Sequence, residues 1–393
     1  MDTLQQGVIA LIHSAISGKA KTLPDMCDLA EIQELARKHQ IENLIYYGAA
    51  NCGVDTALPV MKELFVSTYK YMYMDQRQRQ QLQKLMAAFD ANEIRHLPLK
   101  GVLLKELYPQ TDMRIMGDAD ILILEEQYPR IREIMQESGF AFDYETDHEI
   151  VWKAPGLVLE LHRKLVPERS REFYSYFGTG WDFAVQSVDH PYRYEFSGET
   201  NMLFLFTHFT KHYIGSGIGI RHLVDLWIYQ HSNPDLKQDY ILQELKKMGL
   251  DKFYENVMHT TRVWFEGEEP SAVSEFITSF IFANGVYGTH TNAILAYAAR
   301  DSRYHGGQKR SSTERLVRAV FPGCKELNVE YPVLKKAPIL LPCIWVVRGF
   351  RILLFDRKKI HNKLQDIEKV TDENVDAYQR ALDLVGLDFQ PKE

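Results

Sequence analysis

Two carboxylates, Asp118 and Asp120, stand two residues apart where the apolar run Ile121–Leu124 begins. If this run is a strand, side chains alternate between its two faces, so both carboxylates lie on one face. Carboxylate oxygens, completed by water and substrate phosphates, are the ligands that Mg²⁺ takes from proteins. The spacing therefore indicates a metal–nucleotide site. An isolated pair of this kind is also typical of a turn and cap before a strand, and that alternative stays open here.

A third carboxylate lies in the segment LVLELHRKL of residues 157–165, where leucines alternate with Glu160 and His162. In a strand, Glu160 would therefore point away from the apolar face. If this strand lies beside the one that carries Asp118 and Asp120, three carboxylates converge near a common point. Such a set can hold two metal ions about 3.5–4 Å apart, which clamp an in-line displacement. The alternative is an edge strand on which Glu160 and His162 face solvent.

A possible phosphate-binding turn precedes the carboxylates, since Lys100 and Gly101 separate the short apolar run of residues 96–99 from a helical pattern. A glycine at the start of a helix lets backbone N–H groups approach a phosphate, and Lys100 adds a cation. A plain strand-to-helix turn needs no ligand, and is the alternative.

The elements that must position these residues form a small α+β unit. Between about residues 96 and 165, short apolar runs separated by turn residues predict strands. Helical patterns interrupt them over residues 101–108 and 126–138, the second ending at Gly139 in the usual C-cap position. The predicted unit is thus a sheet with helices packed on it.

Helical periodicity dominates on both sides of this unit, over residues 31–50 and 58–94 and over most of the chain after residue 167. The 393 residues suffice for two or three domains. We therefore expect an N-terminal helical region over residues 1–80, a catalytic core over residues 81–165 and a helical C-terminal domain over residues 166–393.

The composition of the chain argues against several classes of protein. The chain has 46 basic and 53 acidic residues, a net charge of −7 with histidine neutral, so nucleic acid is not the expected partner. Its four cysteines form no Cys-x-x-Cys pair, which argues against a zinc module and a disulfide framework. No signal peptide or membrane-spanning run is recognisable, and we expect a cytoplasmic protein.

In their order along the chain, these motifs resemble the DNA polymerase β-like nucleotidyltransferase superfamily. The segments LPLKGVLLKELYP, DMRIMGDADILI and LVLELHRKL resemble one branch, the uncharacterised nucleotidyltransferase family of bacterial proteins. The resemblance covers about residues 95–165 and implies a small mixed sheet with helices. It makes Asp118 and Asp120 the metal-binding pair and Glu160 the third acidic position, where Asp is commoner. Lys100 and Gly101 stand where the superfamily usually has Gly-Ser.

The resemblance implies a magnesium-dependent nucleotidyltransferase that uses two Mg²⁺ ions and an NTP. It would move a nucleoside monophosphate to an acceptor hydroxyl on a small molecule or protein and release pyrophosphate. The implied catalytic and metal residues are Asp118, Asp120 and Glu160, and the implied nucleotide contacts are Lys100, Gly101, Arg114 and His162. The sequence leaves the acceptor, the base of the NTP and the oligomeric state open.

The resemblance extends faintly into residues 203–229, which look like the helix pair that follows the catalytic unit. There His208 and His212 are four residues apart and would share a helix face, but the Glu of an HExxH zinc protease is missing. We expect His208, His212, Arg221 and Asp225 to line a cleft that faces the sheet. The alternative is a hydrogen-bonded set that ties two helices together.

Two other functions stay open. A nucleotide-sensing or partner-binding protein could retain the same site without turnover, and a helical scaffold could use the two aspartates only as structural caps. The basic, apolar stretch of residues 344–364 could lie on an anionic membrane, although such a stretch is more often a C-terminal packing helix.

Overall fold

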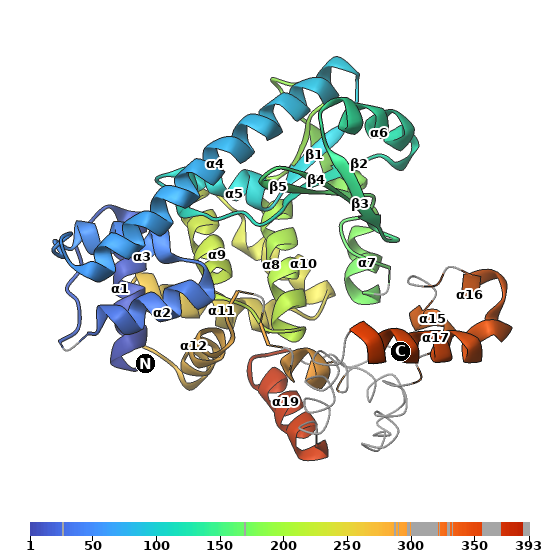
Figure 1. The fold of residues 1–393 in the computed structure, drawn as a ribbon. Coiled ribbons are helices and arrows are strands. Elements are labelled where there is room, and N and C mark those ends of the chain that lie inside the picture. The colour runs from blue at the N-terminus through green and yellow to red at the C-terminus, as the bar shows by residue number, and fades with distance from the viewer. Residues whose placement is uncertain are drawn as a thin grey trace. The chain divides into compact units, whose positions relative to one another are not determined.

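The chain is seen here as a computed structural model (Figure 1). It describes residues 1–25, 27–168, 170–286, 288–289, 291–296, 299, 321, 323–327, 331, 333–355 and 371–387. The chain divides into two compact units, one of residues 1–210 with 218–286 and one of residues 211–217 with 287–393. The first unit contains the sheet and the expected site.

A five-stranded sheet has the order β1-β2-β5-β4-β3. Its strands are β1 (His96–Leu99), β2 (Ala119–Ile123), β3 (Ala141–Glu145), β4 (Glu149–Ala154) and β5 (Leu157–His162). The central pair β2–β5 is parallel and the other pairs are antiparallel. The expected α+β fold with a small mixed sheet is therefore confirmed.

One face of this sheet is closed by a hydrophobic core. Alternate residues of the strands, among them Ile121, Trp152 and Leu159, pack there against α4 (Pro59–Ala91) and α6 (Tyr128–Glu137). Because side chains alternate along a strand, the residues between them point to the opposite face. In Figure 1, α8 (Gly198–Ile214) and α9 (Ile220–Ser232) lie on the opposite side of the sheet from α4.

Helix α4 links the N-terminal helices to the sheet. It follows α1 (Thr3–Ser17), α2 (Leu29–His39) and α3 (Glu42–Asn51), packs against α3, and continues along the sheet to residue 91. The expected boundary between residues 80 and 81 falls inside this continuous helix. Pro59 at the first turn and the absence of a helix breaker within residues 60–91 explain its length of 33 residues.

The rest of the first unit is mainly helical, with one small hairpin. Its strands β6 (Ala184–Gln186) and β7 (Tyr194–Phe196) have three residues each, too short for an alternating pattern to reveal them in the sequence. The sequence analysis expected mostly helices here. The helices are α7 (Arg171–Phe177), α8 (Gly198–Ile214), α9 (Ile220–Ser232), α10 (Gln238–Lys247), α11 (Asp251–Phe265) and α12 (Ala272–Asn284), with α8 reaching the second unit at its end.

The remaining elements are short or lie in the second unit. Single helical turns occur as α5 (Gly101–Leu104) and the 3₁₀ turns η1 (Lys105–Leu107), η2 (Thr111–Met113), η3 (Glu125–Gln127), η4 (Trp181–Phe183) and η5 (Pro338–Leu340). The second unit has α15 (Cys324–Leu327), α16 (Val333–Lys336), α17 (Leu341–Phe355) and α19 (Asp372–Leu384). Residues 356–364 of the basic stretch lie outside the described residues.

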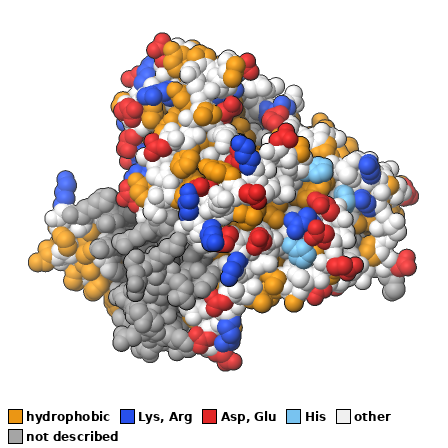
Figure 2. Space-filling view, turned by 180° about the vertical axis from the view of Figure 1, so that it is seen from behind, with side chains coloured by type: hydrophobic (Ala, Val, Ile, Leu, Met, Phe, Trp, Pro, Cys, Tyr) orange, Lys and Arg blue, Asp and Glu red, His pale blue; other side chains and the backbone are white. Residues whose placement is uncertain are grey.

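The surface mixes charges of both signs. On the face in Figure 2, acidic and basic side chains are interspersed, and no broad basic patch gathers among the described residues drawn there. Within the described part of the chain, no helix has the length and apolar character to span a membrane.

Candidate functional site

The centre of the site is the parallel pair β2–β5. Its register sets Asp120 opposite Glu160 and Leu122 opposite His162, all on the face away from the hydrophobic core. Asp120, Glu160 and His162 each offer a ligand atom, and these atoms lie within 4.8 Å of one another. The structure therefore brings together the carboxylates of Asp120 and Glu160, as the alternation of the two strands predicts.

Asp118 stands one residue before β2 and is exposed overall. The protein around its carboxyl group nevertheless removes part of its hydration. This desolvation, followed by the negative charges of Asp120 and Glu160, raises the pKa of Asp118. Asp118 thus lies close enough for the charges of Asp120 and Glu160 to act on it, on the solvent side of the cluster.

One oxygen of Asp120 receives two donors. Lys100 Nζ and His162 Nε2 each lie 2.7 Å from Asp120 Oδ1. Burial alone would raise the pKa of Asp120, but Lys100 and the His162 hydrogen bond outweigh it and hold the pKa well below its usual range. Asp120 is therefore ionised, and its charge is stabilised by the fold.

The ring of His162 is buried between the two carboxylates. Its Nε2 donates to Asp120 and lies 3.6 Å from Glu160 Oε2. Its Nδ1 is buried and has no hydrogen-bond partner in the part of the chain that the structure describes. Burial opposes the charged ring, but the bonds to Asp120 and Glu160 outweigh this and raise the pKa of His162.

Lys100 holds an unusual backbone conformation. Its φ of 42° and ψ of −112° lie outside the left-handed helical well, in a region that residues with a Cβ rarely occupy. The side chain is largely buried, and Nζ lies 5.8 Å from the centre of the Phe204 ring of α8. The residue with the strained backbone is therefore the one whose ammonium group points toward Asp120.

Gly101 is required by close packing. A Cβ at this position would lie 2.7 Å from Arg114 Nη1 and 3.2 Å from Met116 Cγ. The helix that Gly101 begins, α5, has only four residues. The packing of Arg114 explains this glycine without a phosphate.

Arg114 and Asp225 form a buried ion pair between the loop before β2 and α9. The Arg114 guanidinium donates through Nε to Asp225 Oδ1 at 2.8 Å and through Nη2 to Oδ2 at 2.9 Å. Tyr108 also donates to Asp225 Oδ1, at 2.8 Å. The pair thus ties α9 to the loop before β2. The alternative of a hydrogen-bonded set included Asp225 but not Arg114, which the resemblance made a nucleotide contact.

Arg221 lies one turn before Asp225 on α9, and the charge of Asp118 acts on it. Its Nη1 donates to the Ile115 carbonyl at 2.7 Å, while its buried Nε has no hydrogen-bond partner among the described residues. Burial, and next the positive charge of Arg114, lowers the pKa of Arg221, and the charges of Asp225 and Asp118 act against this. Arg221 is therefore a second cation near Asp118.

The two histidines of α8 belong to different units. His208 is half-buried in the first unit, with its ring centre 6.5 Å from that of Phe204, which also contacts Lys100. His212 is half-buried in the second unit. Of the expected cleft residues, Arg221 and His208 lie on the side of the sheet that carries the carboxylates.

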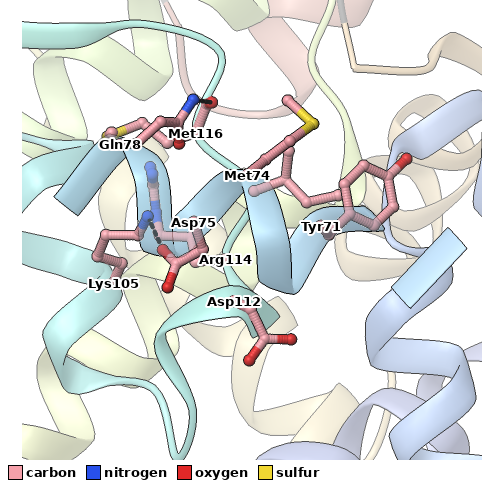
Figure 3. Close-up of a pocket in the computed structure, with 9 residues that line it drawn as sticks. Tyr71, Met74, Asp75, Gln78, Lys105, Asp112, Arg114 and Met116 are labelled. Carbon is pink, nitrogen blue, oxygen red and sulfur yellow. Dashed lines mark hydrogen bonds and ion pairs between the residues drawn. The ribbon is translucent and has the colours of Figure 1, made fainter. Parts of the chain in front are cut away.

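Beneath the loop that carries Arg114, a small pocket contains a further set of polar residues that the sequence analysis missed (Figure 3). Buried Lys105 pairs with Asp75 of α4, and Thr111 Oγ1 donates to Asp75 Oδ2 at 2.6 Å. Gln78 of α4 donates to the Met116 carbonyl at 3.2 Å. Helix α4 therefore holds the loop that leads to Asp118.

A signal for these α4 residues is present in the sequence. Asp75 and Gln78 extend, at helical spacing, the buried stripe of Leu82, Leu85 and Phe89. The polar run of residues 75–84 reads as a solvated face when polarity alone is considered. Its spacing, in contrast, places Asp75 and Gln78 on the buried side.

The donor set suits a hard divalent cation. Asp120 and Glu160 offer carboxylate oxygens on one face, Asp118 lies near enough for their charges to act on its own carboxyl group, and carboxylates are the ligands that Mg²⁺ and Mn²⁺ favour. His162 already donates to Asp120 through Nε2, so it orients a carboxylate in the manner of residues that support a metal ligand.

Comparisons with known proteins give a family model and a distantly similar structure. A family model described as "uncharacterised nucleotidyltransferase" matches residues 25–266, more than half of the chain and every site residue named above. A search of curated proteins finds no match. The solution structure of antibiotic-resistance factor ANT(2'')-Ia is similar at 13% identity and a TM-score of 0.34, over 47% of this chain and 97% of that one. This likeness is too distant to carry a functional argument.

Proposed function

The chain belongs to the uncharacterised nucleotidyltransferase family, and on that premise we propose that it transfers a nucleoside monophosphate from an NTP to an acceptor hydroxyl. Asp118, Asp120 and Glu160 are the proposed metal ligands, and pyrophosphate is the proposed leaving group. The observation that carries the proposal is the parallel β2–β5 register, which sets Asp120 beside Glu160 on the open face of the sheet.

Magnesium, when bound, would supply the positive charge that stabilises the reacting phosphate and the departing pyrophosphate. Three carboxylates are enough for two ions, which is the number we propose. The role of Asp118, Asp120 and Glu160 is to hold and orient them. His162 keeps Asp120 in position through Oδ1.

We propose separate roles for the cations. Lys100 and Arg221 lie near the carboxylates and are placed to meet phosphate charge. Arg114 is paired with Asp225 and, with Gly101 packed against it, acts by holding α9 to the loop before β2. His208 remains a proposed contact on the acceptor side, whereas His212, expected with it, belongs to the second unit.

The acceptor is proposed to be a small molecule or a protein hydroxyl. The net charge of −7 and the interspersed charges on the face of Figure 2 give no support to a nucleic-acid substrate. The four cysteines, all within the described residues, are unpaired, which agrees with a proposed cytoplasmic location.

A second candidate is a nucleotide-binding protein without turnover. It is favoured by one observation, the engagement of Asp120 Oδ1 by both Lys100 and His162. A third, a scaffold in which the aspartates are only caps, predicts no nucleotide-dependent change in melting temperature.

The test supplies each of the four NTPs, labelled at the α-phosphate, with Mg²⁺ and an extract that contains small molecules and proteins. We expect the label to enter an acceptor with wild-type protein and not with Asp118→Asn. Asp147→Asn at the exposed β3–β4 turn is the matched control and should behave as wild type. Binding of Mg²⁺ and a non-hydrolysable NTP without any label transfer would favour the second candidate, and no binding would favour the third.

A further inference from the structure

The ammonium group of Lys100 binds the same carboxylate oxygen, Asp120 Oδ1, that a metal ion would bind. This ammonium lies 2.7 Å from Asp120 Oδ1, and the charges of Asp120, Asp118 and Glu160 all act on it. A lone pair of Asp120 Oδ1 that accepts from this ammonium is not available to a divalent cation. Lys100 is thus a counterion already built into the carboxylate cluster.

The backbone indicates that this placement is specific. Gln40 also has a positive φ, but with φ 53° and ψ 50° it lies in the ordinary left-handed well. Lys100, at φ 42° and ψ −112°, lies where glycine is strongly preferred. A glycine at this position would remove the backbone strain, but it would also remove the ammonium group. The chain therefore has a strained backbone at the residue that supplies the positive charge.

Resting on the proposed function, we infer that Lys100 makes the binding of a divalent metal depend on the nucleotide. In the free protein the ammonium competes with the metal for Asp120 Oδ1. A triphosphate offers the ammonium another anion and offers the metal further oxygen ligands. Metal and nucleotide therefore bind together far better than either binds alone.

The charges of the cluster point the same way. Three carboxylates, the Lys100 ammonium and the Arg221 guanidinium, −3 + 2, leave −1 when His162 is neutral, so the cluster repels a nucleotide that arrives without a metal. A metal that arrives without a nucleotide meets the Lys100–Asp120 pair. When metal and nucleotide bind together, the phosphates have the metal as a counterion and the Lys100 ammonium has a phosphate oxygen as a partner.

The test measures binding and does not need turnover. Mn²⁺, followed by its electron paramagnetic resonance signal, is titrated into wild-type protein, Lys100→Met and Lys100→Gly, with and without a non-hydrolysable NTP. Lys100→Gly relieves the backbone strain and so protects against misfolding of the variant. Lys153→Met, which removes an exposed cation of β4 paired with Asp143, is the control for net charge.

We expect the NTP analogue to lower the wild-type Kd for Mn²⁺ at least about tenfold. Without the analogue, both Lys100 variants should bind Mn²⁺ at least about tenfold more tightly than wild type, because the competing ammonium is gone. The analogue should then add little, and Lys153→Met should match wild type.

Two results would overturn the inference and leave the proposed function standing. One is a wild-type protein that binds Mn²⁺ with the analogue while both Lys100 variants bind Mn²⁺ alone no more tightly than wild type. The other is an equal gain in Lys153→Met, which would assign the effect to net charge. Failure of every protein to bind Mn²⁺ with the analogue would overturn both the inference and the proposed function.

Discussion

Asp118 and Asp120 carry the same functional group, yet the fold shifts their pKa values in opposite directions. The pKa of Asp120 is held low by Lys100 and His162, whereas desolvation and the neighbouring carboxylates raise the pKa of Asp118. Removing the charge of Asp120 would leave the buried Lys100 without its partner. The charge of Asp118, in contrast, can be removed without breaking an ion pair within the described residues.

We therefore expect Asp118→Asn to leave stability unchanged or slightly raised, by less than about 1 kcal/mol because the side chain is exposed. Asp120→Asn should lower the free energy of unfolding, because it leaves Lys100 buried and unpaired. Urea denaturation of both variants at pH 7 measures the contrast. A loss of stability in Asp118→Asn equal to that in Asp120→Asn would show that Asp118 is a structural cap.

Gly101 gives a second prediction at the scale of single residues. Gly101→Ala puts a methyl group 2.7 Å from Arg114 Nη1, so the guanidinium must shift from Asp225. We expect a loss of about 1–3 kcal/mol in the free energy of unfolding. Gly349→Ala on α17, where a Cβ has open space, is the matched control and should stabilise slightly, by up to about 1 kcal/mol, through the higher helix propensity of alanine. Equal effects of the two substitutions would contradict the packing role of Gly101.

At the scale of elements, the Arg114–Asp225 pair fastens α9 to the loop before β2. Asp225→Asn leaves a buried guanidinium without its counterion and should cost about 3–5 kcal/mol. The double substitution Arg114→Met, Asp225→Leu removes both charges and should recover much of this loss. Thermal unfolding of both variants tests the pair. A double variant no more stable than Asp225→Asn would mean that packing, not charge, holds the two elements.

Helix α2 is fastened by a buried histidine. His39 Nδ1 accepts from the Ile220 N–H of α9, and Nε2 faces the Phe282 carbonyl of α12 at 3.3 Å and donates to it. This neutral ring satisfies both partners, and burial lowers the pKa of His39 to about 4. Between pH 4 and the usual value of about 6.5, the unfolded chain binds the extra proton and the folded chain does not.

Stability should therefore fall as the pH drops from about 6.5 towards 4, by about 2–3 kcal/mol from this residue at pH 4.5. His39→Gln keeps one acceptor and one donor but does not titrate, so its pH dependence should be weaker by that amount. Urea midpoints at pH 7 and pH 4.5 make the comparison. The same pH dependence in both proteins would show that His39 is not the titrating group.

At the scale of the whole molecule, the sequence predicts what depends on local alternation and fails where distant segments meet. Glu160 and Asp120 lie on strands with clear patterns, so their shared face could be predicted. Arg114 and Asp225 are 111 residues apart, and no local pattern links them. Their ion pair depends on tertiary packing, so nothing in the local sequence shows that Arg114, a nucleotide contact implied by the resemblance, already has a carboxylate partner.

The expected domain boundary at residue 80 shows the same limit. The sequence predicts one helix over residues 58–94, which α4 confirms, but no local pattern shows that this helix packs against both the N-terminal helices and the sheet. Asp75 and Gln78 then tie the same helix to the loop before β2. One long helix thus supports the N-terminal helices, the sheet and the approach to Asp118.

The most direct test of the proposed nucleotidyltransferase site is a crystal structure with Mn²⁺ and a non-hydrolysable NTP, in which anomalous scattering locates the metal. The account predicts metal density in contact with the carboxylates of Asp118, Asp120 and Glu160, with the triphosphate beside it and the Lys100 ammonium turned from Asp120 to a phosphate oxygen. Metal and triphosphate bound away from these three carboxylates would contradict it.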